Sequence, residues 1–200
     1  MSGMNGSVRE FCGDYAMRHQ DALARGPMGA VAILADALRE ALRSGTQVFL
    51  AGNGGSAANA IHLANDLQYA IGRDATVGVR AEALTANTSV LTCLANDISY
   101  DEVFAHQIRI KGEPGDILIV LSGSGNSTNV VRALEVANDM KLRTFAVLGY
   151  SGGRCREIAQ TAIHFAVDDM QIAEDLQLTV GHMCLQWVRQ QLASERELRV

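Results

Sequence analysis

Residues 116–127 have the sequence DILIVLSGSGNS, and this stretch decides the fold. Its first half is a short, continuous apolar run, which is typical of a strand buried on both faces of a sheet. Its second half contains only Gly, Ser and Asn, and a helical pattern follows to about Met140. A buried strand that runs through a Gly/Ser turn into a helix indicates one unit of a parallel α/β sheet.

The same order of elements recurs elsewhere along the chain. Residues 47–56 (QVFLAGNGGS) precede a helical pattern to about Tyr69, and residues 143–153 (RTFAVLGYSGG) precede a short one. Residues 162–167 have the pattern of a further strand, and weaker patterns add a strand near 81–85 and helices at 88–96 and 101–112. Such alternation predicts a three-layer α/β sandwich, in which helices cover both faces of a parallel sheet.

The sheet is expected to be flanked by helices within a single domain. Apolar residues recur at helical spacing from Val8 to about Ser44, and Gly26-Pro27 interrupts them, which predicts two helices or one sharp kink. We predict one domain over residues 1–200, with a helical N-terminal extension at about 8–44, a sheet core at about 46–170 and a C-terminal helix at about 171–195.

Composition narrows the possible partners and the compartment. The chain is 48% hydrophobic with a net charge of −5, so no broad electrostatic attraction to nucleic acid or to an anionic membrane is expected. Its four cysteines are widely spaced without a CxxC pair, which predicts reduced, mostly buried thiols. The sequence starts with no signal-like segment and contains no apolar run of ~18 residues. We therefore expect a cytoplasmic protein.

The two strongest Gly/Ser loops, at residues 52–56 and 122–128, predict a phosphate site. In parallel sheets a ligand sits beyond the carboxyl ends of the strands, and both loops lie there. Glycines let backbone N–H groups converge, a helix N-terminus adds partial positive charge, and Ser and Thr hydroxyls donate further hydrogen bonds. Helix capping alone also explains such residues, but two loops at one sheet edge favour phosphate. Neither loop matches a nucleotide-binding motif.

At these residues the chain resembles the SIS (sugar isomerase) domain family, and within it the phosphoheptose isomerase branch. The resemblance runs from about residue 8 to 192, and its strongest marks are residues 52–56, His62, Asn96-Asp97, residues 121–127 and Gly152-Gly153. It implies a flavodoxin-like parallel sheet and a homotetramer with active sites between subunits. The implied partner is a small phosphosugar.

The resemblance also implies roles for individual residues. The implied substrate-binding residues are Asn53, Gly54, Gly55, Ser56, Asp66, Asn96, Asp97, Ser122, Gly123, Ser124, Ser127 and Glu174. The implied ligands of one zinc ion per subunit are His62, Asp66, Glu174 and His182. The family has Glu where this chain has Asp66, and Gln where it has Glu174. Both substitutes are legitimate ligands for zinc or another first-row metal.

The implied reaction interconverts a ketose and an aldose phosphate through an enediol. It requires a base at carbon, an acid/base at the oxygens and a group that polarises the carbonyl. By resemblance, Asp66 is the base and His182 the partner at the oxygens. The implied substrate is sedoheptulose 7-phosphate and the product D-glycero-D-manno-heptose 7-phosphate, which feeds heptose synthesis for cell-surface polysaccharide such as lipopolysaccharide or capsule.

Spacing alone leaves alternatives open around these residues. His62 and Asp66 are four apart on an expected helix and share a face, which fits a metal pair or a His beside a solvated Asp. Glu174 and His182 are eight apart, ~12 Å along a helix axis and ~80° around it. One metal reaches both only if long side chains converge or the helix begins after Glu174. Asp175 is in better register with His182 and is an alternative partner for it. Without the resemblance, the position of His182 is more typical of a core histidine than of a ligand.

Other functions remain open at this stage. The same motifs would suit an isomerase of another phosphosugar, such as an arabinose or hexulose phosphate, or a sugar-phosphate sensor. They also occur in non-catalytic scaffolds of the family that resemble the DnaA initiator-associating protein. Asp66 supplies a carboxylate and His182 an imidazole, and the two together favour an enzyme over a scaffold.

Overall fold

The computed structural model describes residues 7–69, 71 and 77–197, so the rest of the predicted 1–200 unit lies outside the described residues. Within them, five strands form one parallel sheet in the order β2-β1-β3-β4-β5. The strands are β1 (Gln47–Gly52), β2 (Arg80–Ala83), β3 (Ile117–Ser122), β4 (Arg143–Leu148) and β5 (Thr161–His164). This order is that of flavodoxin-like folds, so the predicted α/β class is confirmed.

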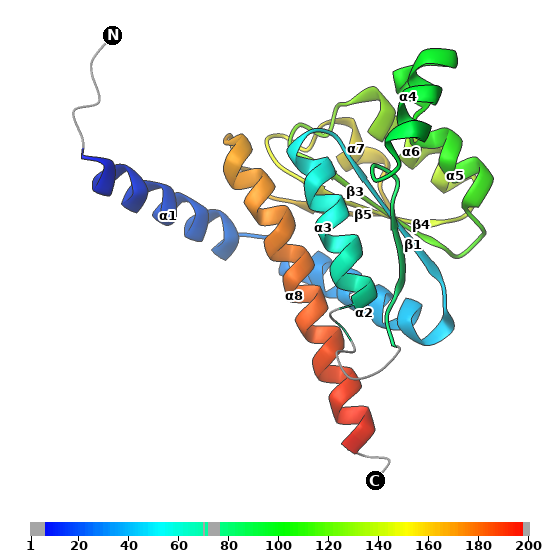
Figure 1. Ribbon diagram of the computed structural model, residues 1–200. Coiled ribbons are helices and arrows are strands. Elements are labelled where there is room, and N and C mark those ends of the chain that lie inside the picture. Colours follow the sequence, from blue (N-terminus) through cyan, green and yellow to red (C-terminus); the bar gives the residue numbers. More distant parts are fainter. Residues whose placement is uncertain (1–6, 70, 72–76, 198–200) are drawn as a thin grey trace.

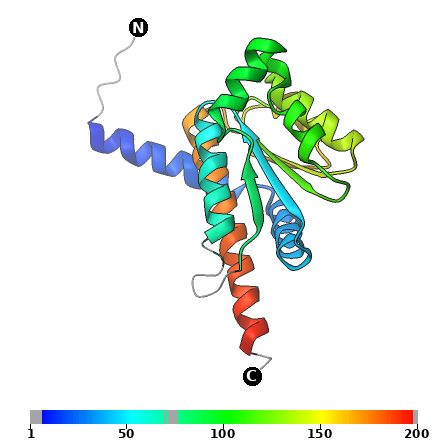
Figure 2. The same cartoon turned by 45° about the vertical axis from the view of Figure 1, so that its right-hand side comes forward.

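Helices cover the sheet on both faces (Figures 1 and 2). They are α1 (Val8–Ala24), α2 (Met28–Ser44), α3 (Gly55–Tyr69), α4 (Thr88–Asp97), α5 (Ala105–Lys111), α6 (Thr128–Asp139), α7 (Gly153–Ile158) and α8 (Met170–Glu197), with a 3₁₀ turn η1 (Tyr100–Glu102). One apolar cluster joins α2, α3 and α8 to the sheet, and a second joins α4 to α7 to its other face. The helix expected at 101–112 is divided into η1 and α5, and the strand expected at 162–167 ends earlier, at His164.

The register of the sheet brings the Gly/Ser loops to one edge. All six residues of β3 are buried, as expected for a central strand of a sheet covered on both faces. In the β1–β3 pair Gly52 lies opposite Leu121, and in the β3–β4 pair Ser122 lies opposite Leu148. The strands therefore end level with one another, and the loops that follow them converge.

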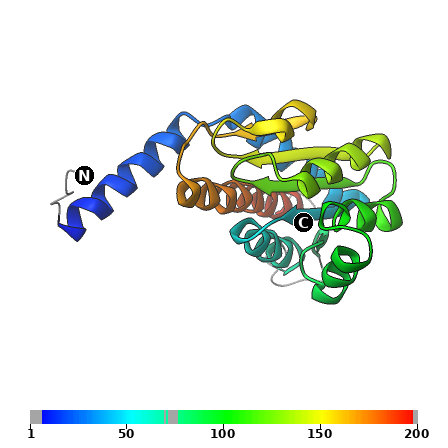
Figure 3. The same cartoon turned by 90° about the horizontal axis from the view of Figure 1, so that it is seen from above.

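Helix α1 differs from the rest because none of its residues is buried. It projects away from the sheet as an arm, seen clearly from above (Figure 3). Its chain breaks at Gly26-Pro27, which confirms two N-terminal helices. Two polar contacts tie the arm to the start of α8: the Tyr15 hydroxyl donates to Asp175 Oδ2 at 2.5 Å, and Arg18 pairs with Asp169 at 2.5 Å.

The cysteine prediction holds only in part. Cys155 and Cys184 are buried, whereas Cys12 and Cys93 are exposed, so the expectation of mostly buried thiols is wrong for half of them. Cys12 is exposed because it lies on the α1 arm, and Cys93 because α4 buries only Leu94. Among the described residues, no helix has the length and apolar character that crossing a bilayer requires.

Candidate active site

A cleft of about 280 Å³ opens where the loops after β1 and β3 meet. Nine of the twelve expected substrate-binding residues line it: Asn53, Gly54, Gly55, Ser56, Ser122, Gly123, Ser124, Ser127 and Glu174. Leu121 and Met170 complete the described lining, which contains no lysine or arginine. An anion in this cleft would therefore be held by neutral donors.

The serine hydroxyls of the cleft keep their donors free for a ligand. Ser122 and Ser124 Oγ each accept a hydrogen bond from a backbone N–H of their own loop, at 3.0 and 3.3 Å. Ser56 Oγ accepts one from Gln177 Nε2 at 2.9 Å. A hydroxyl that accepts still has its O–H to donate. Ser127 occupies the N-cap position of α6 but makes no side-chain capping bond, so capping does not account for its hydroxyl.

The loop between β4 and α7 supports the serine loop. Gly149 N–H donates to the carbonyl of Gly123 at 3.0 Å, and Cys155 N–H donates to that of Gly125 at 2.9 Å. Gly125 has a φ of 68°, and a Cβ there would collide with the carbonyl of Gly152. Only glycine allows this close approach of the two backbones without strain.

Glu174 joins the cleft from α8, which packs beside α3 (Figure 1). A Cβ at Gly55 would collide with the Glu174 carboxylate, so the carboxylate lies over the first turn of α3. Asn59 Nδ2 donates to the backbone carbonyl of Glu174 and to Gln177 Oε1, both at 3.0 Å. The partial positive charge of a helix N-terminus favours a carboxylate there.

Asn53 is fixed at the rim of the cleft by three hydrogen bonds. Its amide forms a reciprocal pair with that of Asn129, at 2.8 and 2.9 Å. The Tyr100 hydroxyl also donates to Asn53 Oδ1 at 2.9 Å. Asn129 is 2% exposed, so the pair is anchored in the interior on one side and borders the cleft on the other.

A second group of polar side chains lies further along α3 and α8. The Nε2 atoms of His62 and His182 are 3.1 Å apart, and Asp66 Oδ2 lies 3.4 Å from the first and 3.5 Å from the second. The predicted common face of His62 and Asp66 is confirmed. His182 is half exposed and converges with them, so it is not a core histidine.

These three residues suit a metal ion. Each offers one ligand atom, and the atoms lie within 4.8 Å of one another. Tetrahedral zinc with bonds of ~2.0–2.1 Å holds its ligand atoms ~3.3–3.4 Å apart, close to the three separations here. Two imidazoles and one carboxylate are also a donor set found at zinc sites.

Glu174, which the resemblance implies as a fourth metal ligand, lies apart from this group. Among the described residues the possible metal group contains His62, Asp66 and His182 only, while Glu174 lines the cleft, because eight residues of one helix keep Glu174 and His182 apart. Asp175 does not replace it, since it accepts from Tyr15.

Asn96 and Asp97 are also absent from the cleft lining. They end α4 as exposed residues, with Asn96 Nδ2 donating to Asp97 Oδ1 at 2.7 Å. This bond, followed by one from the Cys93 thiol, lowers the pKa of Asp97.

Three further residues shape the site and were not predicted from the sequence: Tyr100, Asn129 and Gln177. Two of them carried a detectable signal, because Asn129 and Gln177 are polar residues at core positions of helices α6 and α8. A buried polar group requires a partner, and such positions therefore point to a network. Tyr100 carried no such signal, since it lies in a short exposed turn.

The sequence of this chain is similar to those of known proteins. Residues 13–149 match the SIS domain family. A phosphoheptose isomerase of Rhodospirillum rubrum is 35% identical over 196 residues, covering 96% of this chain and 100% of that protein. One of Akkermansia muciniphila is 39% identical over 155 residues, covering 76% of this chain and 80% of that protein.

Solved structures of phosphoheptose isomerases also resemble the fold of this chain. The phosphoheptose isomerase of Neisseria gonorrhoeae has a TM-score of 0.82 and 27% identity to this chain, covering 90% of this chain and 96% of that one. That of Francisella tularensis has the same TM-score of 0.82 at 25% identity, covering 92% of this chain and 100% of that one. The chain therefore belongs to the SIS domain family and, within it, to the phosphoheptose isomerases.

Proposed function

We propose that this chain is an aldose–ketose isomerase that converts sedoheptulose 7-phosphate into D-glycero-D-manno-heptose 7-phosphate. Relatives that match most of this chain carry the name phosphoheptose isomerase. The observation that carries the proposal is the convergence of Asp66, His62 and His182 within 3.5 Å of one another, beyond a serine-lined cleft. A scaffold without catalysis has no need of such a group.

The cleft would bind the phosphate end of the substrate. Hydroxyls of Ser122, Ser124 and Ser127 and the amide of Asn53 would donate to the phosphate and the adjacent sugar oxygens. The α6 N-terminus adds its partial positive charge. Glu174, as a carboxylate, would accept hydrogen bonds from sugar hydroxyls. Binding at this end orients the other end of the chain toward the histidines.

Asp66 and His182 would move the protons. Asp66 removes the proton from the carbon beside the carbonyl and returns it to the neighbouring carbon, so the enediol lies between the two steps. His182 shuttles a proton between the two oxygens. The Asn65 amide donates to Asp66 Oδ1 at 3.3 Å, and Asp66 Oδ2 faces the histidines. The Asn65 contact thus holds one carboxylate oxygen, while the other faces the histidines.

Zinc is the metal that we propose for this site, held by His62, Asp66 and His182. When bound, it would supply a Lewis acid that polarises the carbonyl oxygen and lowers the cost of the enediolate charge. The triangle of ligand atoms described above supports this assignment. Glu174, the fourth expected ligand, would instead serve the substrate.

The distance between the two regions favours a long sugar. Glu174 borders the cleft and His182 belongs to the His–Asp cluster, and eight residues of helix separate them by ~12 Å along the axis. A phosphosugar that is anchored at the cleft and reacts at the cluster needs a carbon chain that spans much of this separation. A heptose phosphate meets this requirement better than a triose phosphate does.

We further propose that the enzyme works as a homotetramer in the cytoplasm, with active sites between subunits. His62 is 50% exposed, which leaves the cluster open to water that a neighbouring subunit would exclude. Exposed apolar side chains lie close by on α8, at Met183 and Trp187, and along the α1 arm, at Phe11 and Met17. Such surfaces are typical of contacts between copies.

Turnover of sedoheptulose 7-phosphate by the purified protein tests the function. We expect formation of the aldose heptose 7-phosphate, lost on treatment with a chelator and restored by zinc. Arabinose 5-phosphate serves as the matched shorter substrate. Binding of the heptose phosphate without turnover under any metal would overturn the isomerase proposal in favour of a scaffold. Faster turnover of arabinose 5-phosphate would show that the substrate is the pentose phosphate and not the heptose phosphate.

A further inference from the structure

The 3₁₀ turn η1 makes two neighbouring polar contacts that both involve α6. Tyr100 donates to Asn53 Oδ1, which is shared with Asn129 of α6. Glu102 Oε1 accepts from Arg132 Nε of α6 at 2.7 Å. Asn129 and Arg132 are three residues apart on α6, about one helical turn, and Tyr100 and Glu102 are the first and last residues of η1. The turn is therefore held to α6 directly through Glu102 and indirectly, by way of Asn53, through Tyr100.

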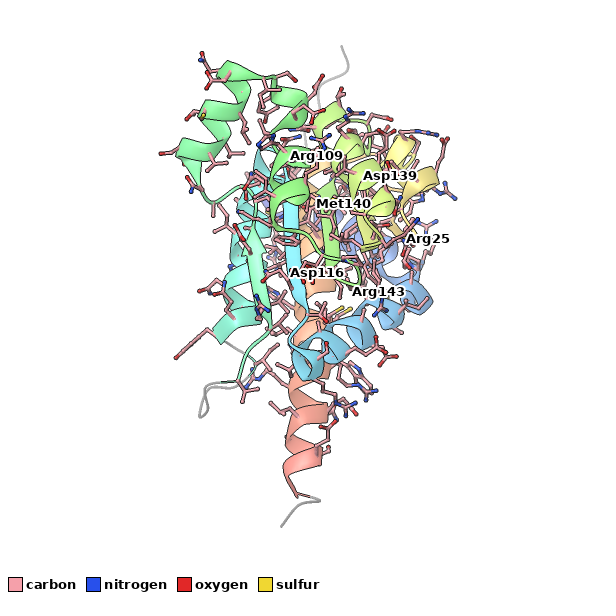
Figure 4. The ribbon with its side chains drawn as sticks, turned by 90° about the vertical axis from the view of Figure 1, so that its right-hand side faces the viewer. Arg25, Arg109, Asp116, Asp139, Met140 and Arg143 are labelled. Atoms are coloured by element: carbon pink, nitrogen blue, oxygen red, sulfur yellow. The ribbon has the colours of Figure 1, made fainter. Side chains whose placement is uncertain are left out.

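Glu102 fixes η1 through a second helix as well. Its Oε2 accepts from Arg109 Nη1 at 2.6 Å, and Figure 4 shows Arg109 on the outer face where α5 and α6 lie. Hydrogen bonds from Arg109 and then Arg132 hold the pKa of the Glu102 carboxyl below its usual range. The Glu102 side chain is only 19% exposed, so the clamp is partly shielded from solvent. This clamp leaves Tyr100 little freedom in backbone position.

The bonds of Asn53 determine which way its amide faces the cleft. Asn53 Oδ1 accepts two hydrogen bonds, from Tyr100 and Asn129, and Nδ2 donates one. An amide nitrogen has two donors, and among the described residues only one is engaged. The second N–H of Asn53 is thus available at the rim of the cleft. A reversed amide would instead present its oxygen, which repels anionic oxygens.

We propose that Tyr100 is a positioning residue, whose hydroxyl holds the Asn53 amide as a donor toward a phosphosugar oxygen in the cleft. This inference rests on the proposed function, because that function makes a phosphosugar the ligand of the cleft. Tyr100 is 58% exposed, so burial of its ring contributes little to the core. Tyr100 contributes to the site through its hydroxyl, which donates to Asn53 Oδ1. Tyr100 also follows Asp97 by three residues and so ties the end of α4 to the cleft.

A double-mutant cycle tests the proposal. The variants are Tyr100→Phe, Asn53→Ala and their combination, and the readouts are the Kd of sedoheptulose 7-phosphate by calorimetry, KM and kcat. Tyr100→Phe should raise Kd and KM about fivefold, the size expected for one hydrogen bond, with kcat within about twofold. In the Asn53→Ala background the same change should have less than about a twofold effect, because the two residues act together. Tyr69→Phe, which alters a tyrosine that is 69% exposed at the end of α3, is the matched control.

Each other outcome overturns the inference in a recognisable way. A Kd for Tyr100→Phe equal to that of the wild type would show that the hydroxyl does nothing for binding. An equal loss in both backgrounds would show that Tyr100 acts by general stabilisation and not through Asn53. If the wild-type protein bound no sedoheptulose 7-phosphate, the proposed function would fall together with the inference. Normal wild-type binding with an unaffected Tyr100→Phe would remove the inference alone.

Discussion

The Gly/Ser cleft and the His62–Asp66–His182 cluster lie along the same two helices but are built by different means. Most of the cleft comes from the segments that directly follow β1 and β3, which the sheet register aligns, and Met170 and Glu174 of α8 complete it. The cluster takes His62 and Asp66 from α3 and His182 from α8, and only the packing of these helices brings them together.

This difference separates binding from chemistry. The cleft offers neutral donors on a rigid sheet edge, which suits recognition of an anion. The cluster offers groups that titrate or bind metal on helix surfaces that are half exposed. If the two regions work separately, a change in one should leave the property of the other intact.

The largest effect is expected from Asp66→Asn. Loss of the base should lower kcat by about 10²–10⁴-fold, the range for removal of a general acid–base group. The Kd of sedoheptulose 7-phosphate should change by less than about threefold, because the phosphate is held in the cleft. Steady-state kinetics and calorimetry check the two halves of this expectation.

Two further variants control that measurement. Asp139→Asn changes an exposed aspartate at the end of α6, on the outer face seen in Figure 4, and should leave kcat unaltered. Asp66→Glu restores the side chain that the family resemblance implies and should retain measurable turnover. An active Asp66→Asn enzyme would show that another group takes the proton.

The contrast between the regions explains what the sequence could predict. Strands and loops such as residues 116–127 could be predicted, because a buried apolar run followed by Gly and Ser is a local signal. The pairing of His62 with Asp66 was equally local, four residues apart on one helix. Parallel strands that end level then place the loops together without further information.

What could not be predicted depends on packing between distant elements. The angle and register of α8 against α3 decide that His182 meets His62 while Glu174 meets Gly55, and no spacing rule contains that register. The division of the 101–112 helix at Val103-Phe104, which brings Tyr100 to Asn53, follows from tertiary contacts as well.

Zinc binding should give the next largest effect. Zinc at about 100 times its Kd stabilises the native state by ~2.7 kcal/mol, which corresponds to about 5–10 °C in the Tm of a protein of this size. The shift should disappear in His62→Ala and His182→Ala. His106→Ala on α5 is the matched control and should keep the full shift. An undiminished shift in both cluster variants would place the metal elsewhere.

A smaller effect is expected from Ser124→Ala in the cleft. Removal of one hydroxyl that donates to a phosphate should raise the Kd of sedoheptulose 7-phosphate about tenfold, since hydrogen bonds to charged groups are the stronger ones. The zinc-dependent rise in Tm should remain, because the cluster is not touched. Ser151→Ala, an exposed serine in the loop after β4, is the control. A loss of the zinc response in Ser124→Ala would contradict the separation of the two regions.

The smallest effect is expected from Glu102→Gln, which weakens the clamp on the cleft side. Because the folded-state pKa of Glu102 is lowered below its ordinary value of 4.5 by hydrogen bonds from Arg109 and Arg132, its ionised form stabilises the fold above about pH 4.5. This contribution is lost as the pH falls through the folded-state pKa. The wild type should exceed Glu102→Gln in Tm by about 2 °C at pH 7, since partly exposed ion pairs contribute little, and this gap should be smaller at about pH 3.

Glu40→Gln is the matched control for that comparison, because Glu40 pairs with Arg143 but has a side chain that is 62% exposed. Its gap from the wild type should stay near zero at both pH values. Glu102→Gln should also weaken binding of sedoheptulose 7-phosphate about twofold through Tyr100, while the zinc-induced rise in Tm stays unchanged. A gap as large at pH 3 as at pH 7 would mean that Glu102 acts by packing, because an ion pair weakens as its carboxylate is protonated.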